Sequence, residues 1–111
     1  MPDPRWDALA ETLIQHSTRL AAGETLLIEC FDLEDSTLPR LLVQKAARRG
    51  ANPLVETKDS RLIRELVKHG SEAQMRAWGD YELHRMQRID AYIALRGRAT
   101  SARWPTSPAR R

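Results

Sequence analysis

The chain has 111 residues and a formal charge of +3, from 18 basic and 15 acidic side chains, with a pI near 9.5. This length suits one small domain or part of a larger protein. No apolar run approaches the roughly 20 residues of a membrane-spanning helix, and the charged N-terminal segment is unlike a secretory signal peptide. A single cysteine, Cys30, excludes an internal disulfide and a cysteine-based zinc site. We therefore expect a cytoplasmic protein with no membrane partner.

The excess positive charge lies at the C-terminus. Residues 1–97 hold 14 basic and 15 acidic side chains, a net charge of −1. Residues 98–111 hold four arginines and no acid, a net charge of +4. The basic pI therefore describes the tail and not the body. Four charges in an aperiodic tail are a weak and non-specific signal for nucleic-acid binding, so we do not expect nucleic acid as a partner.

The first half of the chain alternates helical and strand patterns. Asp3 and the proline after it predict a helix start, because the carboxylate can accept from free N–H groups and proline is well suited to the first helical position. Apolar residues then recur at helical spacing until Gly23. Residues 25–30 form a nearly continuous apolar run, which is typical of a strand covered on both faces. Ser36 is the expected N-cap of a second helix, which ends at Gly50.

The second half repeats this alternation and adds a helix. Residues 52–57 predict a second strand, and Asp59 is the expected cap of a third helix. Ser71 and Gln74 have the spacing of a capping box and open a fourth helix. Residues 90–96 predict a third strand. The order α-β-α-β-α-α-β predicts an α/β fold: a small parallel sheet of about three strands with helical crossovers, like a fragment of a Rossmann-like α/β sandwich.

Beyond Gly97 the periodic pattern stops. Residues 98–111 are rich in arginine, proline and serine, and we expect them to be disordered or loosely attached. The chain then divides into an α/β domain at 1–97 and a tail at 98–111. Three strands leave open sheet edges, which normally need pairing or cover. We therefore expect the chain either to self-associate as a homo-oligomer or to be marginally stable.

Carboxylates gather where the predicted strands end. In open α/β sheets, ligands tend to bind outside the carboxyl ends of the strands. Glu29, Asp32 and Glu56 lie at or near those ends, and carboxylate oxygens are ligands for hard cations. The competing interpretation, which we prefer, is a solvated rim with helix caps.

Cys30 and several aromatic and basic residues are further candidates for a functional site. Cys30 at a strand end would be a nucleophile if His16 or His84 acted as its base. No pattern brings either histidine near it, so a buried, inert thiol is preferred. The acidic segment after the first strand disfavours phosphate binding. Trp78, like Trp6, is expected in a core or interface. Four arginines are expected to be helix-end or solvated cations: Arg48, Arg49, Arg85 and Arg88.

Three segments resemble a known enzyme family. Residues 3–29 contain Asp-Pro-Arg-Trp and later Ala-Gly-Glu-Thr-Leu-Leu-Ile-Glu, residues 49–53 read Arg-Gly-Ala-Asn-Pro, and residues 90–97 read Asp-Ala-Tyr-Ile-Ala-Leu-Arg-Gly. Their order and spacing are similar to the N-terminal part of the thermophilic-type metallo-aminopeptidases. These are the M29 peptidases, which include aminopeptidases T, S and II.

The resemblance implies an exopeptidase that removes N-terminal residues from peptide substrates. It would use two divalent ions (zinc, cobalt or magnesium), one of which activates the attacking water. The family's metal ligands and its tyrosine lie in a larger C-terminal domain whose motifs do not occur in this sequence. We therefore assign no catalytic and no metal-binding residue to this chain, leave its binding residues unknown, and expect it to be inactive alone. In the family this N-terminal domain helps to shape the enclosed site and the dimer.

The resemblance ends after Gly97. Family members continue with an Asn-containing loop and then Asp-Val-Pro, whereas this chain continues with residues 98–105, Arg-Ala-Thr-Ser-Ala-Arg-Trp-Pro. With permissible GC-rich codons, the same DNA read two bases further on can spell the family's continuation. We therefore hypothesise a frameshift after residue 97 that truncates the enzyme. The alternative is a stand-alone α/β binding module whose basic tail contacts nucleic acid or an acidic partner.

Overall fold

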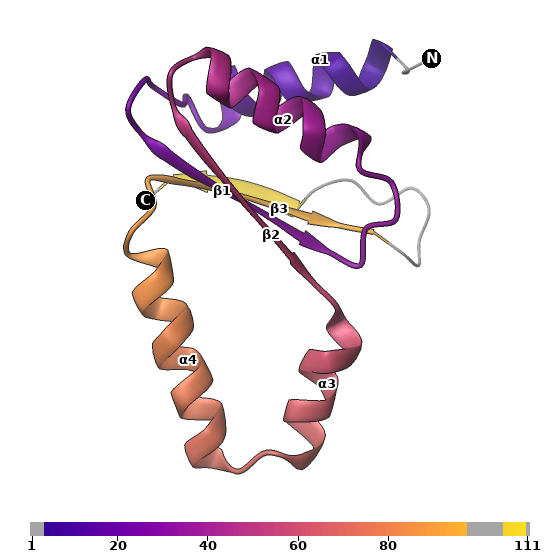
Figure 1. Cartoon of the computed structure of the whole chain (residues 1–111), viewed down its shortest axis with the longest axis vertical. Coiled ribbons are helices and arrows are strands. Elements are labelled where there is room, and N and C mark those ends of the chain that lie inside the picture. The colour runs from indigo at the N-terminus through magenta and orange to yellow at the C-terminus, as the bar shows by residue number, and fades with distance from the viewer. Residues whose placement is uncertain (1–3, 98–105, 111) are drawn as a thin grey trace.

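The computed structural model describes residues 4–97 and, for the backbone, residues 106–110. Its strands form one sheet with the order β2-β1-β3-β4 (Figure 1). In chain order the elements are α1 (Pro4–Thr12), the π-helical turn η1 (Leu13–Ser17), β1 (Thr25–Phe31), α2 (Thr37–Arg48), β2 (Asn52–Lys58), α3 (Ser60–His69), α4 (Glu72–Met86), β3 (Ala91–Arg96) and β4 (Thr106–Arg110).

Strand β1 lies between β2 and β3 and runs parallel to both. Ile28 of β1 is in register with Val55 of β2 and with Ile93 of β3. The inner five residues of β1 are buried, as expected for a strand covered on both faces. Helix α2 joins β1 to β2, and α3 with α4 joins β2 to β3. The predicted α/β class, with three parallel strands joined by helical crossovers, is confirmed.

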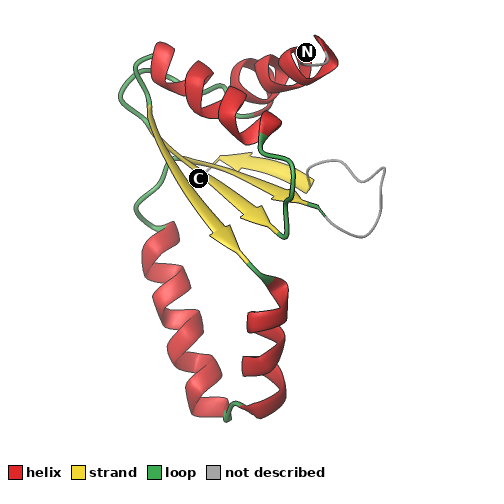
Figure 2. Ribbon diagram, turned by 45° about the vertical axis from the view of Figure 1, so that its right-hand side comes forward, coloured by secondary structure: helices red, strands yellow, loops and turns green. Residues whose placement is uncertain are grey.

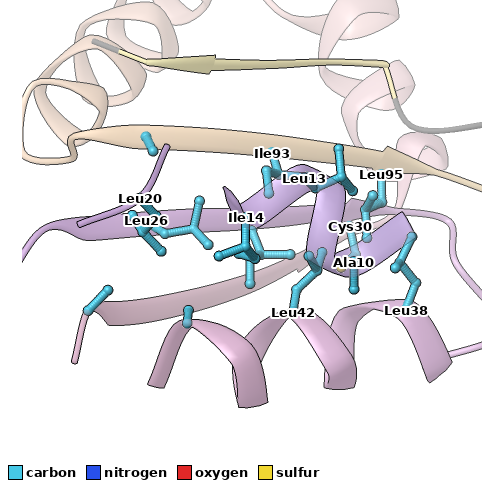
Figure 3. Close-up of a cluster of buried hydrophobic side chains, with 14 residues drawn as sticks. Ala10, Leu13, Ile14, Leu20, Leu26, Cys30, Leu38, Leu42, Ile93 and Leu95 are labelled. Carbon is cyan, nitrogen blue, oxygen red and sulfur yellow. The ribbon is translucent and has the colours of Figure 1, made fainter. Parts of the chain in front are cut away.

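Helices α1 and α2 cover one face of the sheet, and the hydrophobic core lies between them and the strands (Figure 2). Figure 3 shows Ile14 and Leu42 from the helical layer packed against Leu26 and Cys30 of β1. Each fully buried Leu or Ile side chain contributes roughly 1.5–3 kcal/mol relative to an exposed one. Trp6 packs against this core, as predicted.

The first helix changes its geometry before it ends. The backbone N–H of Thr18 donates to the carbonyl of Leu13 at 3.0 Å, which is the five-residue spacing of a π-turn. The Thr18 hydroxyl lies 2.9 Å from the same carbonyl oxygen and 3.1 Å from that of Ile14. Because Thr18 is fully buried, these contacts keep its polar atoms satisfied. Leu20 then follows outside the helix and is still fully buried.

Three of the four predicted helix caps fall in the described part of the chain, and the fourth, Asp3, lies outside it. Asp59 accepts a hydrogen bond from the second backbone N–H of α3 at 2.9 Å. Ser71 and Gln74 make both hydrogen bonds of the capping box. Ser36 is the N-cap residue of α2, as predicted, but its side chain makes no capping hydrogen bond. The carboxylate of Asp35 caps the helix instead. It accepts a hydrogen bond from the backbone N–H of Thr37, the first helical residue, at 2.9 Å, and another from the Thr37 hydroxyl at 2.7 Å.

Helices α3 and α4 form a hairpin, called here the arm (residues 60–86), that extends away from the other face of the sheet (Figures 1 and 2). Neither helix contains a buried residue. Leu62, Trp78 and Tyr81 are 70%, 40% and 61% exposed, so Trp78 does not belong to the core. Within the described ranges, no helix is both long and apolar enough to cross a membrane.

Part of the tail differs from the expected disordered or loosely attached segment. Strand β4 pairs antiparallel with β3, with Tyr92 opposite Ala109 and Ala94 opposite Thr106. Without β4, β3 would be an open edge, which readily accepts another strand. Pro108 is compatible with such an outer strand. Residues 98–105 and 111 lie outside the described residues, and the division of the chain at residue 97 stays a prediction.

Candidate functional site

The face of the sheet toward the arm carries charged side chains near its centre. Successive residues of a strand alternate between the two faces, so Ile28 points into the core and Glu29 points toward the base of the arm. Glu29 is only 3% exposed. The side chains gathered around it, called here the polar cluster, are Glu29, Glu56, Lys58, Glu82, Arg85 and Tyr92.

Glu29 is paired by side chains from three different elements. The hydroxyl of Tyr92 on β3 donates to its Oε1 at 2.6 Å. The Nζ of Lys58 on β2 lies 2.7 Å from its Oε2, and the Nη2 of Arg85 on α4 donates to the same oxygen at 3.0 Å. A buried carboxylate is strongly disfavoured unless it is paired and hydrogen-bonded. These three contacts therefore explain why the central strand tolerates a glutamate.

The cations also contact the outer carboxylates of the cluster. Arg85 donates to Glu56 at 2.7 Å and to Glu82. Lys58 donates to Glu82 at 3.0 Å, and its Nζ lies 5.2 Å from the ring centroid of Trp78. Three carboxylates and two cations give the cluster a formal charge of −1. The Nε of Arg85 is buried and has no hydrogen-bond partner within the described part of the chain.

The pairing holds the central groups in fixed protonation states. Burial acts to raise the pKa of Glu29, but hydrogen bonds from Lys58 and Tyr92 outweigh it and hold that pKa below its usual value. Burial acts to lower the pKa of Lys58, but its bonds to the carboxylates raise that pKa. Burial and the hydrogen bond to Glu29 raise the pKa of Tyr92. At neutral pH Glu29 and Lys58 are charged and Tyr92 is neutral, so none of the three is poised for general acid–base chemistry.

The polar cluster joins both ends of the arm to the sheet. Lys58 is the last residue of β2, just before α3 begins, and Arg85 lies in the last turn of α4. Both contact Glu29 of the central strand. Since the arm helices bury no residues of their own, these charged contacts do much to orient it. The arrangement therefore acts as an electrostatic anchor.

Of the three predicted metal candidates, the structure brings Glu29 and Glu56 together and leaves Asp32 apart. Glu29 and Glu56 are both hydrogen-bonded to Arg85, whose guanidinium stands where a bound cation would have to lie. Asp32 instead accepts from the backbone N–H of Ser60 at 2.9 Å and from its hydroxyl at 2.6 Å. No three His, Cys, Asp or Glu side chains of the described residues are grouped for a metal ion. The preferred interpretation, a solvated rim with helix caps, agrees with the position of Asp32 before α3. That interpretation did not predict that Glu29 is buried.

Cys30 lies on the core face of β1, among apolar side chains (Figure 3). It is 3% exposed, and burial together with the charge of Glu29 raises the pKa of its thiol. Little reactive thiolate is therefore present at neutral pH. His84 is exposed on α4, beyond the opposite face of the sheet, and His16 is exposed at the end of η1. The structure agrees with a buried, inert thiol.

Other charged residues at the carboxyl ends of the strands are paired within the chain. Asp59 pairs with Arg61 at 2.7 Å, and the guanidinium of Arg96 lies 4.2 Å from the ring centroid of Phe31. An open depression of about 540 Å³ at this rim is lined by side chains of both signs, Asp32 among them. Mixed charge of this kind is unlike an anion-binding cradle, which presents N–H groups and cations to the anion.

Sequence reasoning missed most partners of Glu29. Arg85 was expected to be a helix-end or solvated cation; it lies in the last turn of α4, but its side chain is only 12% exposed. Tyr92 was treated only as a strand residue. One signal was present, because a carboxylate within an apolar strand requires a buried partner. The sequence does not say which of its many cations supplies the partner, since Arg85 lies 56 positions from Glu29 along the chain.

These observations define an α/β domain whose charged face anchors a helical arm. No protein-family model matches the chain, and no curated protein matches it. Among solved structures, the chain is similar to wild-type AmpT from Thermus thermophilus, with a TM-score of 0.51 and 28% sequence identity. The match covers 63% of this chain and 18% of the AmpT chain. The chain thus corresponds to less than a fifth of that protein.

Proposed function

We propose that this chain is an N-terminal domain fragment of a metal-dependent aminopeptidase of the M29 type. The observation that carries the proposal is its similarity to AmpT, which is a metal-dependent aminopeptidase. The M29-like segments of the sequence are compatible with it. Residues 3–29 include α1 and most of β1, residues 49–53 reach the start of β2, and residues 90–97 include β3. The resemblance therefore involves every parallel strand of the domain.

In this proposal the chain contributes structure to the enzyme and not its reacting groups. Its buried carboxylate, Glu29, is already neutralised by Lys58 and Arg85, so the polar cluster does not fit a pair of divalent ions. The ions and their ligands belong to the remaining, larger part of such an enzyme, where a bound ion would supply an activated water. The residues of this chain would hold the arm and the sheet as one wall next to that part.

A chimeric AmpT tests the proposal. In it, residues 4–97 of this chain replace the AmpT segment with which they align. We expect the folded chimera to release nitroaniline from aminoacyl-nitroanilides, and to lose that activity with a chelator. A matched control carries an unrelated three-stranded α/β domain of similar length and should be inactive. A chimera that folds and binds metal but shows no more turnover than this control contradicts the proposal.

The isolated chain provides the complementary test. We expect the purified 111-residue protein to hydrolyse no aminoacyl-nitroanilide when zinc or cobalt is added, because none of its described residues is grouped to hold a metal ion. Turnover that remains with the pure chain, and that scales with its concentration, would show that we are wrong to place the catalytic groups outside it.

A further inference from the structure

The side of the sheet next to β3 is closed by the last strand of the chain. Strand β4 runs antiparallel to β3, with Ala109 opposite Tyr92 and Thr106 opposite Ala94. It is the last strand in the sheet order, so among the described residues it forms the outer edge on this side. Whether this edge accepts a further strand depends on where its backbone N–H and carbonyl groups point.

The backbone of β3 faces its two neighbours alternately. The N–H of Gly97, which follows β3, donates to the carbonyl of Phe31 in β1 at 2.9 Å. Backbone polar groups alternate sides along a strand, so Ile93, four residues earlier, also directs its groups toward β1. Tyr92 and Ala94 therefore direct theirs toward β4.

Strand β4 meets these groups and places its proline where no donor is needed. Ala109 and Thr106, which lie opposite the two outward-facing residues of β3, are placed to exchange backbone hydrogen bonds with them. Between them the register shifts, so that Ser107 and Pro108 both lie opposite Ile93 in a β-bulge. Because Ile93 directs its groups toward β1, the N–H that proline lacks is not required for pairing with β3.

The outer side of β4 combines features that discourage strand pairing. The strand is only five residues long, its bulge interrupts the regular spacing, Pro108 offers no donor, and Arg110 adds a positive charge. Short edge strands, bulges, prolines and charged residues are means by which natural sheets avoid edge-to-edge association. Residues 91–95 of β3, in contrast, contain neither a proline nor a charge. The pairing of β4 thus replaces a permissive edge by a protected one.

We propose that β4 is a guard strand, which closes the β3 edge within the chain and blocks the addition of an extended segment from another molecule. The excluded segment is one that would pair with the outward N–H and carbonyl groups of Tyr92 and Ala94, as in recognition by strand addition. The guard has the advantage of its tether, because only residues 97–105 separate it from β3. A short link of this kind gives an effective concentration in the millimolar range.

Amide hydrogen exchange followed by NMR resolves the two sides of β3. In the wild type, the N–H groups of Tyr92 and Ala94 should be protected by β4, and that of Ile93 by β1. Ala109→Pro removes the donor opposite Tyr92, so we expect Tyr92 and Ala94 to exchange at least about tenfold faster. Ile93 should keep its protection and serves as the internal control for folding. Ala109→Ser retains the N–H and should behave as the wild type does.

A peptide probe tests the guarding role itself. The probe is the peptide Thr-Val-Thr-Val-Thr, blocked at both ends and added at millimolar concentration. It should leave the amide signals of Tyr92 and Ala94 unshifted in the wild type and shift both in Ala109→Pro. Pro108→Val restores an outward donor and keeps the pairing with β3. In that variant the probe should shift the signals of residues 106–110, which it leaves unchanged in the wild type.

Three results would overturn the proposal. One is equal exchange of Tyr92 and Ala94 in the wild type and in Ala109→Pro, because β4 would then not hold the edge. Another is a probe that shifts these two signals in the wild type as strongly as in Ala109→Pro. A third is a Pro108→Val variant whose residues 106–110 do not respond to the probe. None of these outcomes depends on peptidase activity, so they leave the proposed function untouched.

Discussion

Replacement of Arg85 by methionine tests the anchoring role of the polar cluster. The change keeps an apolar stem of similar length but removes the guanidinium that donates to Glu29 at 3.0 Å and to Glu56 at 2.7 Å. Removing one partner of a buried ion pair typically destabilises a protein by 3–5 kcal/mol. Glu29 keeps Lys58 and Tyr92 as partners, so we expect a smaller loss of about 2–3 kcal/mol.

The loss is measured by urea unfolding followed by circular dichroism. Thermal unfolding gives a second readout. For a domain of this size, a change of about 1 kcal/mol in the free energy of unfolding shifts Tm by roughly 4–8 °C, so Arg85→Met should lower Tm by about 10–20 °C. Arg88→Met is the matched control, because Arg88 is exposed two residues after α4 ends. It should change the free energy of unfolding by less than about 0.5 kcal/mol. Equal stability of the two variants would refute the anchoring role.

Three other predictions concern single groups. Because pairing lowers the pKa of folded Glu29, its contribution to stability is present above the unfolded pKa and is lost as the pH falls through the folded pKa; Glu29→Gln should flatten this acid dependence in urea titrations. Because burial and its hydrogen bond raise the pKa of Tyr92, its contribution is lost as the pH rises; the absorbance of the wild type should show a strongly alkaline phenolate step that is missing in Tyr92→Phe. Cys30 should react with a thiol reagent only as fast as the protein unfolds, and rapid labelling of the native chain would contradict the buried, high-pKa thiol.

The sequence predicts the parallel part of the fold well because its signals there are local. Residues 25–30 are too continuously apolar for a half-exposed strand, and Gly23 and Gly50 adopt positive φ angles of 85° and 83° at the turns that bracket the first crossover. The cap at Asp59 depends only on its own helix start. Ser36 occupies the predicted N-cap position but makes no side-chain bond there, while the neighbouring Asp35 accepts from the first N–H of α2; propensity alone does not decide which of two adjacent residues makes that bond.

The features that were missed depend on contacts between distant residues. The strand β4 forms because the edge of β3 accepts it, although Pro108 and the flanking composition carry no strand pattern. The polar cluster requires Arg85 to meet Glu29 from the far end of a two-helix crossover. The position of Arg85 beside Glu29 follows from the length and direction of α4. The local sequence pattern predicts the helix but not its direction relative to the sheet. Trp78 was expected in a core or interface because aromatic residues usually are, but the arm leaves it 40% exposed.

The central claim, that this chain is the N-terminal part of an M29-type aminopeptidase, is tested most directly by the DNA that follows codon 97. We predict that a frame shifted from the present one continues with an Asn-containing loop and Asp-Val-Pro. It should then encode a larger domain that carries the Glu, His, Asp and Tyr residues of the family's metal site. A verified sequence in which no downstream frame encodes such a domain would contradict the claim.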